Sequence, residues 1–198
     1  FSNEVAETRL IRVLKRAGDI VRKLKNSYQA IPETISLGSE TEQVVIDISK
    51  GLESEKKLFR IKYLSEGPAG PIRIPRIGHY QIVENLVRNA VEALPEEGGE
   101  IAVRRFEKNG RPTLLVQDNG PGIQSEIQDR IFDFDFTTRP GHGMGLGLGI
   151  VKRTCKEIGA QITLKSAPGA GTEFMISFEP AGVSDSAIRP SVRGASTL

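Results

Sequence analysis

The chain has 198 residues and a formal net charge of +2 at pH 7, with 38% hydrophobic and 26% charged residues. This balance is typical of one sizeable globular domain plus an appendage, and it shows no excess of positive charge that would favour nucleic acid as a partner. The sequence contains no apolar run long enough to span a bilayer and no signal peptide, so we expect no membrane contact by this stretch of chain.

A single cysteine, Cys155, excludes a disulfide framework within the chain and fits a reducing, cytoplasmic compartment. Cys155 lies in a helical pattern, where a small buried hydrophobe is a simpler interpretation than a nucleophile. The chain starts at Phe1 rather than at a methionine, so we expect a fragment of a longer protein, whose full length is compatible with a membrane anchor.

The N-terminal part of the sequence predicts helices. Over residues 7–31 apolar side chains recur at helical spacing in a narrow stripe, the other faces are strongly basic, and Pro32 ends the run. We assign residues 1–38 to this long helix. Ser39 and Glu42 have the spacing of a capping box, which predicts a second helix over residues 39–57.

The rest of the sequence alternates between strand and helix patterns. Strands are predicted at 59–63, 72–74, 101–103, 114–116, 160–166 and 172–178, and helices at 78–94 and 145–158, with residues 123–144 irregular. Asn109-Gly110 is typical of a hairpin turn. Residues 39–180 therefore predict an α+β domain, a two-layer sandwich of a mixed sheet with helices on one face. Residues 181–198 predict a disordered tail.

Two asparagines are the first candidates for binding. Asn85 and Asn89 are four residues apart, so both amides lie on one face of the predicted helix, at the edge of its apolar side. A neighbouring loop would satisfy one amide, whereas the pair favours a ligand. Amide oxygens are hard, neutral ligands, suited to a Mg²⁺ ion that keeps several waters and takes phosphate oxygens as further ligands.

The segment "VQDNGPGI", residues 116–123, ends a predicted strand in a turn. A tight turn alone explains the composition. In the functional interpretation, Asp118 accepts a hydrogen bond from an exocyclic amine, and Gly120 and Gly122 let the backbone lie against a flat ring.

Two further segments have a structural and a functional interpretation. "RIFDFDFTT", residues 130–138, is unusually apolar for a loop, which fits a buried flap, a strand, or a lid whose Phe132, Phe134 and Phe136 close over a ligand. The glycines of "GHGMGLGLGIVKR", residues 141–153, lead straight into a helix. They form either a flexible loop before a helix or a receptor for phosphate made of free backbone N–H groups.

The order of these signals is more specific than any one of them. Together with the final "GTEF", they resemble the N, G1, F and G2 boxes of the catalytic ATP-binding domain of bacterial sensor histidine kinases, in the Bergerat-type (GHKL) ATPase superfamily. The resemblance covers residues 39–180. "NLVRNAVEAL" and "FTTR" are most similar to the nitrogen-regulatory branch of these kinases.

The resemblance implies ATP as substrate, Mg²⁺ as cofactor, and a role for each matching position. It assigns metal binding and catalysis to Asn85 and Asn89, a lid cation to Arg139 rather than to Arg130, and nucleotide contacts to Asn89, Asp118, Gly120, Gly122, Thr138, Gly143, Gly145, Leu146, Gly147 and Thr172. Asp118 accepts the adenine amine, supported by Thr172, and the residues from 143 to 147 hold the phosphates.

The implied function is transfer of the ATP γ-phosphoryl to a histidine, for relay to the receiver domain of a response regulator, by a kinase that is a homodimer at full length. His79 and His142 lack the sequence around a phosphoacceptor histidine and are interpreted as local hydrogen-bonding residues. The acceptor is therefore expected on a helix outside this chain, and residues 7–31 resemble the second helix of the dimerisation hairpin.

Two alternatives stay open. One is an ATP hydrolase of the same superfamily with nucleotide-gated dimerisation, and the other is a non-catalytic nucleotide-sensing or docking module. Hydrolytic relatives carry a water-activating glutamate where Asn85 stands here, and Glu84 lies about 100° around the helix. This difference favours the kinase.

Overall fold

The structure is a computed structural model that describes residues 31–52, 58–134, 136–137 and 145–182. Its elements, in chain order, are β1 (Glu33–Ile35), α2 (Leu37–Leu52), β2 (Phe59–Ser65), β3 (Ile72–Ile74), α3 (Arg76–Ala93), β4 (Gly99–Lys108), β5 (Arg111–Asp118), a 3₁₀ turn (Ser125–Ile127), α4 (Gly147–Glu157), β6 (Gln161–Ser166) and β7 (Thr172–Ser177). None of the helices in these ranges is long and apolar enough to cross a membrane.

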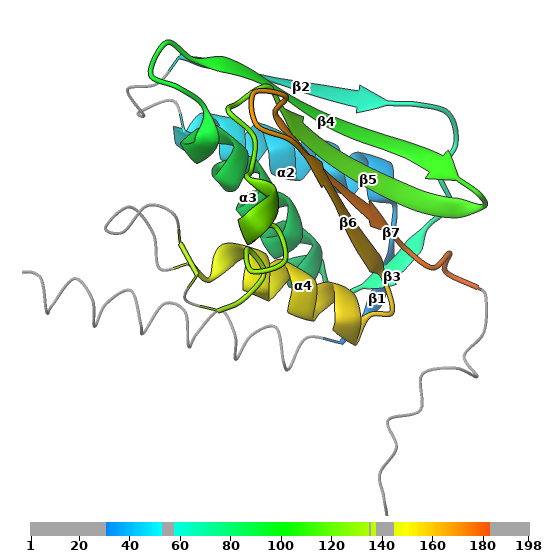
Figure 1. The fold of residues 1–198 in the computed structure, drawn as a ribbon. Coiled ribbons are helices and arrows are strands. Elements are labelled where there is room, and N and C mark those ends of the chain that lie inside the picture. The colour runs from blue at the N-terminus through cyan, green and yellow to red at the C-terminus, as the bar shows by residue number, and fades with distance from the viewer. Residues whose placement is uncertain (1–30, 53–57, 135, 138–144, 183–198) are drawn as a thin grey trace, which may run out of the picture.

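A mixed sheet forms one layer of the described fold (Figure 1). The strand order is β2-β4-β5-β7-β6, in which β2 pairs with β4 in parallel and every other neighbouring pair is antiparallel. The hairpin between β4 and β5 turns at Asn109 and Gly110, which both have positive φ angles (53° and 74°), as the two-residue turn requires. The predicted mixed sheet and its Asn-Gly hairpin are confirmed.

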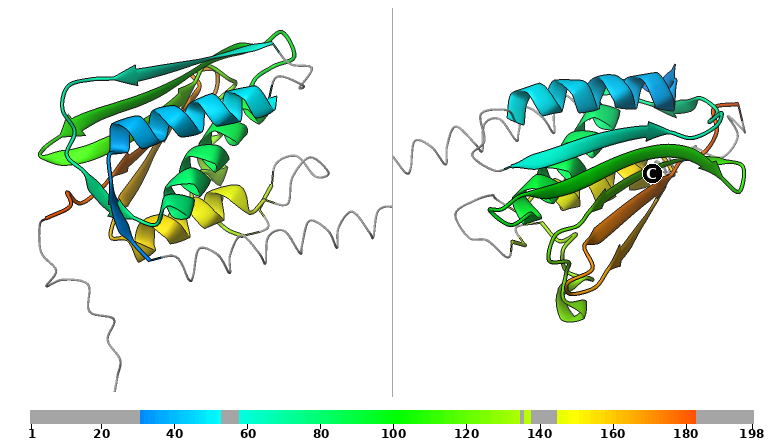
Figure 2. Two further views of the ribbon diagram at one scale, coloured as in Figure 1. Left: turned by 180° about the vertical axis from the view of Figure 1, so that it is seen from behind. Right: turned by 90° about the horizontal axis from the view of Figure 1, so that it is seen from above.

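Helices α2, α3 and α4 form the other layer and lie on one face of the sheet (Figure 2). Helix α3 packs against both α2 and α4 as well as against β4 and β5. Its apolar residues recur at the helical period, so they form one buried face, made of Ile82, Val83, Leu86, Val87, Ala90 and Val91. The predicted two-layer α+β architecture with helices on one face is therefore confirmed, and α3 is the helix with neighbours on most sides.

The start of α2 differs from the prediction. The helix begins at Leu37, and the N–H of Glu40 already donates to the carbonyl of Ser36 (3.2 Å). Ser39 therefore lies inside the first turn, and the predicted capping box does not start the helix. The reason is Leu37, which is fully buried and already belongs to the buried stripe that continues through Thr41, Val44 and Ile48.

Strand β1 was not predicted, because Glu33-Thr34-Ile35 has one apolar residue and no alternation, whereas Ile72-Arg73-Ile74 alternates. It pairs antiparallel with β3 in a separate two-stranded sheet, and a bridge between Ile72 and Pro180 attaches the end of the domain to the same sheet.

Three predicted segments lie outside the described residues: 7–30 of the N-terminal helix, 53–57 of the second helix, and 183–198 of the tail. The division of the chain at residues 38 and 180 stays a prediction.

The interpretations of His79 and Cys155 fit the structure, whereas His142 lies outside the described residues. His79 is only 1% exposed, and its Nε2 forms a 3.0 Å hydrogen bond with Oγ1 of Thr41, joining α3 to α2. Cys155 is 1% exposed, and burial raises its pKa to about 12, so its thiol stays protonated and unreactive.

Burial of His79 makes the stability of the fold depend on pH. Burial lowers the pKa of His79 from 6.5 to about 4, so the unfolded chain takes up this proton before the folded chain does. The contribution is fully present above pH 6.5 and is lost as the pH falls from 6.5 towards 4. We expect His79 alone to lower the free energy of unfolding by about 2 to 3 kcal/mol between pH 7 and pH 4.5.

Denaturant unfolding at a series of pH values measures this effect, with His79→Gln as the variant that cannot titrate. The variant should lose that part of the pH dependence while the remaining carboxylates keep theirs. If the free energy of unfolding depended on pH equally in wild type and variant, the assignment of this effect to His79 would be wrong.

Candidate functional site

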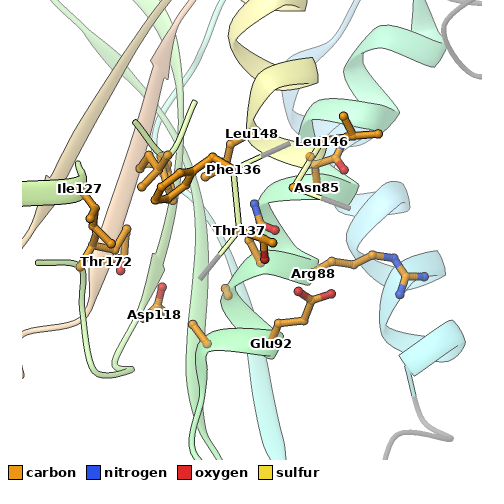
Figure 3. A pocket seen from close by; sticks show the side chains of 18 of the residues that line it. Asn85, Arg88, Glu92, Asp118, Ile127, Phe136, Thr137, Leu146, Leu148 and Thr172 are labelled. Atoms are coloured by element: carbon orange, nitrogen blue, oxygen red, sulfur yellow. The ribbon is translucent and has the colours of Figure 1, made fainter. Parts of the chain in front are cut away.

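A cavity of about 550 Å³ lies between α3, the ends of β5 and β7, the segment after β5, and the start of α4 (Figure 3). The structure brings together most of the predicted site residues as lining residues of this cavity: Asn85, Asn89, Asp118, Gly122, Gly145, Leu146, Gly147 and Thr172. Gly120 is not among the described lining residues, and its N–H donates to Oδ1 of Asp118 (2.8 Å). Thr138, Arg139 and Gly143 lie outside the described residues, so their roles stay predictions.

The two asparagines present their amide oxygens towards the start of α4. Nδ2 of Asn85 donates to the carbonyl of Gln81 (2.8 Å), which turns Oδ1 of Asn85 away from its own helix. A Cβ atom placed on Gly147 would lie 3.1 Å from Oδ1 of Asn85 and 3.6 Å from Oδ1 of Asn89. The two oxygens therefore converge on the space beside Gly147.

Asn89 also carries an unsatisfied donor. Its Nδ2 atom is buried and has no hydrogen-bond partner among the described residues. A buried amide without a partner destabilises the fold by roughly 1–3 kcal/mol, so its presence in a cavity wall points to a ligand.

The start of α4 leaves backbone donors available. Leu146 precedes the helix without a side-chain cap, and the first bond along the helix runs from the N–H of Ile150 to the carbonyl of Leu146 (2.9 Å). The N–H groups ahead of Ile150 have no intrahelical acceptor, and the helix dipole adds a partial positive charge there. Gly145, with φ of 64°, turns the chain into this helix. The site can therefore hold an anion beside the two amide oxygens.

Asp118 and Thr172 form the opposite side of the cavity (Figure 3). Asp118 is 6% exposed and Thr172 is 5% exposed. Burial raises the pKa of Asp118 above its usual value, and hydrogen bonds from the backbone N–H groups of Gly120 (2.8 Å) and Thr172 oppose this effect. The result is a buried carboxylate that is held in place by the backbone and can accept one more hydrogen bond from a ligand.

The glycines after Asp118 have a role within the protein itself. Gly122 has a φ of 72°, and a Cβ atom on it would lie 2.0 Å from the carbonyl oxygen of Ala167. A Cβ atom on Gly120 would lie 2.9 Å from Oδ1 of Asp118. The close approach of the β6–β7 turn and of the Asp118 carboxylate therefore already requires both glycines. Contact of Gly120 and Gly122 with a flat ring stays a prediction.

The three phenylalanines of the predicted lid do not share one face. Phe132 packs into the core with its ring edge-to-face against Phe174 (6.1 Å between centroids, 83°), whereas Phe134 is half exposed. Only Phe136 lines the cavity, and the guanidinium of Arg130 lies 4.9 Å from its ring. Phe132 is held by the core and Phe134 lies beside Gly149, so the three rings form no common face in this structure; closure of the segment over a ligand stays a prediction.

Sequence reasoning missed the apolar wall of the cavity. Ile123, Ile127, Leu148, Ile150 and Phe174 line it together with Phe136. In the sequence Leu148, Ile150 and Phe174 follow the same periodicity as core residues, and Ile123 and Ile127 lie in a segment predicted to be irregular. No pattern distinguishes a side chain that lines a cavity from one that fills the core.

Comparison with known proteins identifies the family of the domain that contains this cavity. Residues 75–182, more than half of the chain, match the family described as histidine kinase-, DNA gyrase B-, and HSP90-like ATPase. Sensor protein ChvG of Agrobacterium fabrum is 41% identical over 103 residues, which cover 48% of this chain and 17% of that protein. Sensor histidine kinase DcuS of Escherichia coli is 42% identical over 93 residues, covering 46% and 17%.

Other similarities extend further along the chain. ChvG of Rhizobium meliloti is 29% identical over 208 residues, covering 91% of this chain and 35% of that protein. The chain therefore spans at most about a third of the length of these relatives. Among solved structures, full-length ShkA in complex with AMPPNP has a TM-score of 0.67 at 24% identity, covering 86% of this chain and 38% of that chain.

The mycobacterial sensor histidine kinase MprB has a similar fold, with a TM-score of 0.63 at 22% identity, covering 75% of this chain and 97% of that chain. The curated relatives thus carry the names of sensor kinases, and the structural neighbours share the two-layer fold. Since the family match runs without interruption from the residue before α3 to the end of the described domain, this chain belongs to the histidine kinase-, DNA gyrase B- and HSP90-like ATPases.

Proposed function

We propose that this chain is the catalytic ATP-binding module of a two-component sensor kinase, which transfers the γ-phosphoryl group of ATP to a histidine on a segment outside this chain. The observation that carries the proposal is the convergence of the amide oxygens of Asn85 and Asn89 on the uncapped start of α4. The names of the relatives support the kinase class.

In this proposal the nucleotide lies across the cavity. Asp118 accepts a hydrogen bond from the exocyclic amine of adenine, next to Thr172, and the apolar wall around Phe136 and Phe174 packs against the base. The N–H groups at the start of α4 bind the phosphates, for which the helix dipole is favourable. The cavity is large enough for a nucleotide, and its two polar ends match the two polar ends of ATP.

The residues present fit Mg²⁺. Two neutral amide oxygens converge at the phosphate end, and in the described part of the chain no group of three or more His, Cys, Asp or Glu side chains could hold a metal ion. Asn85 and Asn89 would therefore hold Mg²⁺ together with phosphate oxygens and water. When bound, Mg²⁺ neutralises charge on the phosphates.

The chemistry proposed for the module is positioning. A neutral imidazole nitrogen of the acceptor attacks the γ-phosphorus, a nitrogen–phosphorus bond forms, the bond from the γ-phosphorus to the bridging oxygen breaks, and ADP leaves. Asp118 and the start of α4 fix the two ends of the nucleotide, so the γ-phosphoryl group is aligned before the acceptor arrives. The phosphohistidine would then serve the receiver domain of a response regulator, and the full-length kinase would act as a homodimer.

The hydrolase alternative requires a carboxylate beside the phosphates. Glu84 is not among the described lining residues, and its Oε1 lies 3.3 Å from Nε of Arg88, which does line the cavity. The carboxylates among the described lining residues are Asp118 and Glu92. Asp118 is bound by backbone N–H groups at the opposite side, and Glu92 lies at the other end of the labelled stretch of α3 from Asn85 (Figure 3). Neither Asp118 nor Glu92 is therefore placed to activate a water next to Asn85.

The first prediction tests transfer. We expect this chain with radiolabelled ATP and Mg²⁺ to show slow hydrolysis and little labelling of itself, and to label a supplied histidine-bearing helical hairpin with an acid-labile phosphate. Asn89→Ala should abolish labelling of the hairpin. Asn109→Gly, which removes an amide from the remote β4–β5 turn at a positive φ that glycine accepts, is the matched control and should leave labelling intact.

Two outcomes would contradict the kinase. Rapid multiple-turnover phosphate release that Glu84→Ala abolishes would support the hydrolase instead. Tight ATP binding without transfer to any hairpin and without hydrolysis would support the non-catalytic nucleotide sensor.

The second prediction concerns the adenine end. Asp118→Asn places an amide donor against backbone N–H donors, so the carboxylate's hydrogen bond to the ligand is lost. We expect ADP affinity, measured by isothermal titration calorimetry, to fall about tenfold or more, the usual effect of a hydrogen bond to a charged group. The exposed Asp47→Asn on α2 is the control, and an unchanged Kd for ADP in Asp118→Asn would rule out the assignment.

The third prediction concerns the phosphate end. Gly147→Ala adds a methyl group 3.1 Å from Oδ1 of Asn85, in the space on which both amide oxygens converge. We expect binding of ADP with Mg²⁺ to weaken about tenfold or more, while the melting temperature does not fall, because alanine is a better helix former than glycine. Gly51→Ala on α2, where nothing lies within 4 Å of the added Cβ, is the control for the gain in helix propensity. Normal nucleotide affinity in Gly147→Ala would show that the ligand does not use this space.

A further inference from the structure

Two backbone segments touch beside the adenine end of the cavity. The turn between β6 and β7 lies against the loop after β5, with the N–H of Gly169 donating to the carbonyl of Pro121 (2.7 Å). A Cβ atom on Gly171 would lie 2.1 Å from the carbonyl oxygen of Asp118, which shows how close the two backbones are. The position of Thr172 relative to Asp118 is therefore set by the contact between these segments.

The hydroxyl of Ser166 lies at the centre of this contact. Its Oγ accepts a hydrogen bond from the N–H of Ile123 (2.9 Å) and donates to the carbonyl of Gly171 (2.8 Å). It also lies 3.3 Å from Oγ1 of Thr172. Gln128 supports the same junction, because its Nε2 donates to the carbonyls of Ile123 (2.9 Å) and Ser166 (3.1 Å).

Counting protons decides the direction of the bond between Ser166 and Thr172. A hydroxyl has one proton to donate and two lone pairs to accept with. Ser166 gives its proton to the carbonyl of Gly171, which can only accept, and takes one from the N–H of Ile123, which can only donate. Thr172 must therefore donate to Ser166, and the lone pairs of Thr172 remain for other partners.

We propose that Ser166 is a positioning residue for base selectivity: it holds the proton of the Thr172 hydroxyl away from the cavity, so that Thr172 and Asp118 present only acceptors to the base. This inference rests on the proposed function, in which the cavity binds an adenine nucleotide. Thr172 and Asp118 line the same side of the cavity (Figure 3) and are both almost fully buried.

Two acceptors select an amine over a carbonyl. The exocyclic amine of adenine has two N–H donors, which match the Asp118 carboxylate and the Thr172 oxygen. Inosine carries a carbonyl oxygen at the same ring position. Its neighbouring N1–H can still donate to Asp118, but the Thr172 oxygen would face the carbonyl oxygen as acceptor against acceptor. When Ser166 is replaced by alanine, the Thr172 hydroxyl can rotate its proton into the cavity and donate to that carbonyl.

The experiment compares ADP with IDP, which share ribose and phosphates, by calorimetric titration of the whole chain. We expect wild type to prefer ADP, and Ser166→Ala to lower the ratio of the two affinities about tenfold, the usual effect of one hydrogen bond. Ser166→Thr, which restores a hydroxyl, should restore the ratio. Ser177→Ala is the matched control: this half-buried strand serine lies 3.4 Å from the Thr113 hydroxyl at the far end of β7 and should leave the ratio unchanged.

A double-mutant cycle tests whether Ser166 acts through Thr172. Thr172→Val removes the hydroxyl at nearly constant shape, and in that background Ser166→Ala should leave the ratio as it is. A ratio that falls as far in the Thr172→Val background as in wild type would overturn the inference. So would equal weakening of ADP and IDP by Ser166→Ala, because a merely structural residue affects both nucleotides alike.

Two further results separate this inference from the proposed function. If wild type binds ADP and Ser166→Ala keeps the wild-type ratio, the proposed function stands and the role of Ser166 is refuted. If wild type binds neither nucleotide, both are refuted. Thermal unfolding checks that each variant folds, and Ser166→Cys, whose thiol is a weak hydrogen-bonding group of similar size, replaces Ser166→Ala if the alanine variant does not fold.

Discussion

Burial of α3 between α2, α4 and the sheet is the constraint on which the site depends. The apolar stripe of α3 fixes the rotation of the helix about its axis, because turning it would expose Ile82, Leu86 and their neighbours to water. Asn85 and Asn89 lie at the edge of that stripe, so their amides are held towards α4 by the packing of the core. Core packing of the apolar stripe therefore fixes the orientation of α3, and Nδ2 of Asn89 stays buried without a hydrogen-bond partner in the described part of the chain as a result.

The two ends of the cavity obtain their polarity in different ways. At the α4 end the donors are backbone N–H groups and the acceptors are the neutral amide oxygens of Asn85 and Asn89. At the β5 end a carboxylate is buried, and backbone N–H groups of Gly120 and Thr172 offset part of its desolvation. Both ends use backbone N–H groups, which a side-chain substitution does not remove. The polarity of the cavity therefore depends on the fold of the backbone.

The sequence was sufficient to predict those parts of the fold that rest on periodicity and turn chemistry. The face of α3, the Asn109-Gly110 hairpin and the glycine-led start of α4 all follow from local patterns. Strand β1, the early start of α2 and the different directions of Phe132, Phe134 and Phe136 depend on contacts between distant segments, which no local pattern records. Ser166 was missed for the same reason, since its partners Ile123 and Thr172 belong to other elements.

The parallel pairing of β2 with β4 gives α3 a second role, as part of the connection between these two strands. Parallel strands need a crossover connection, and here α3 lies in the crossover between these two strands. The helix with both asparagines therefore acquires its packing only as sequence-distant strands meet, and such non-local contacts form slowly. The asparagines therefore reach their places only when β2 pairs with β4, and no segment of the chain shorter than the span from β2 to β4 can acquire that pairing.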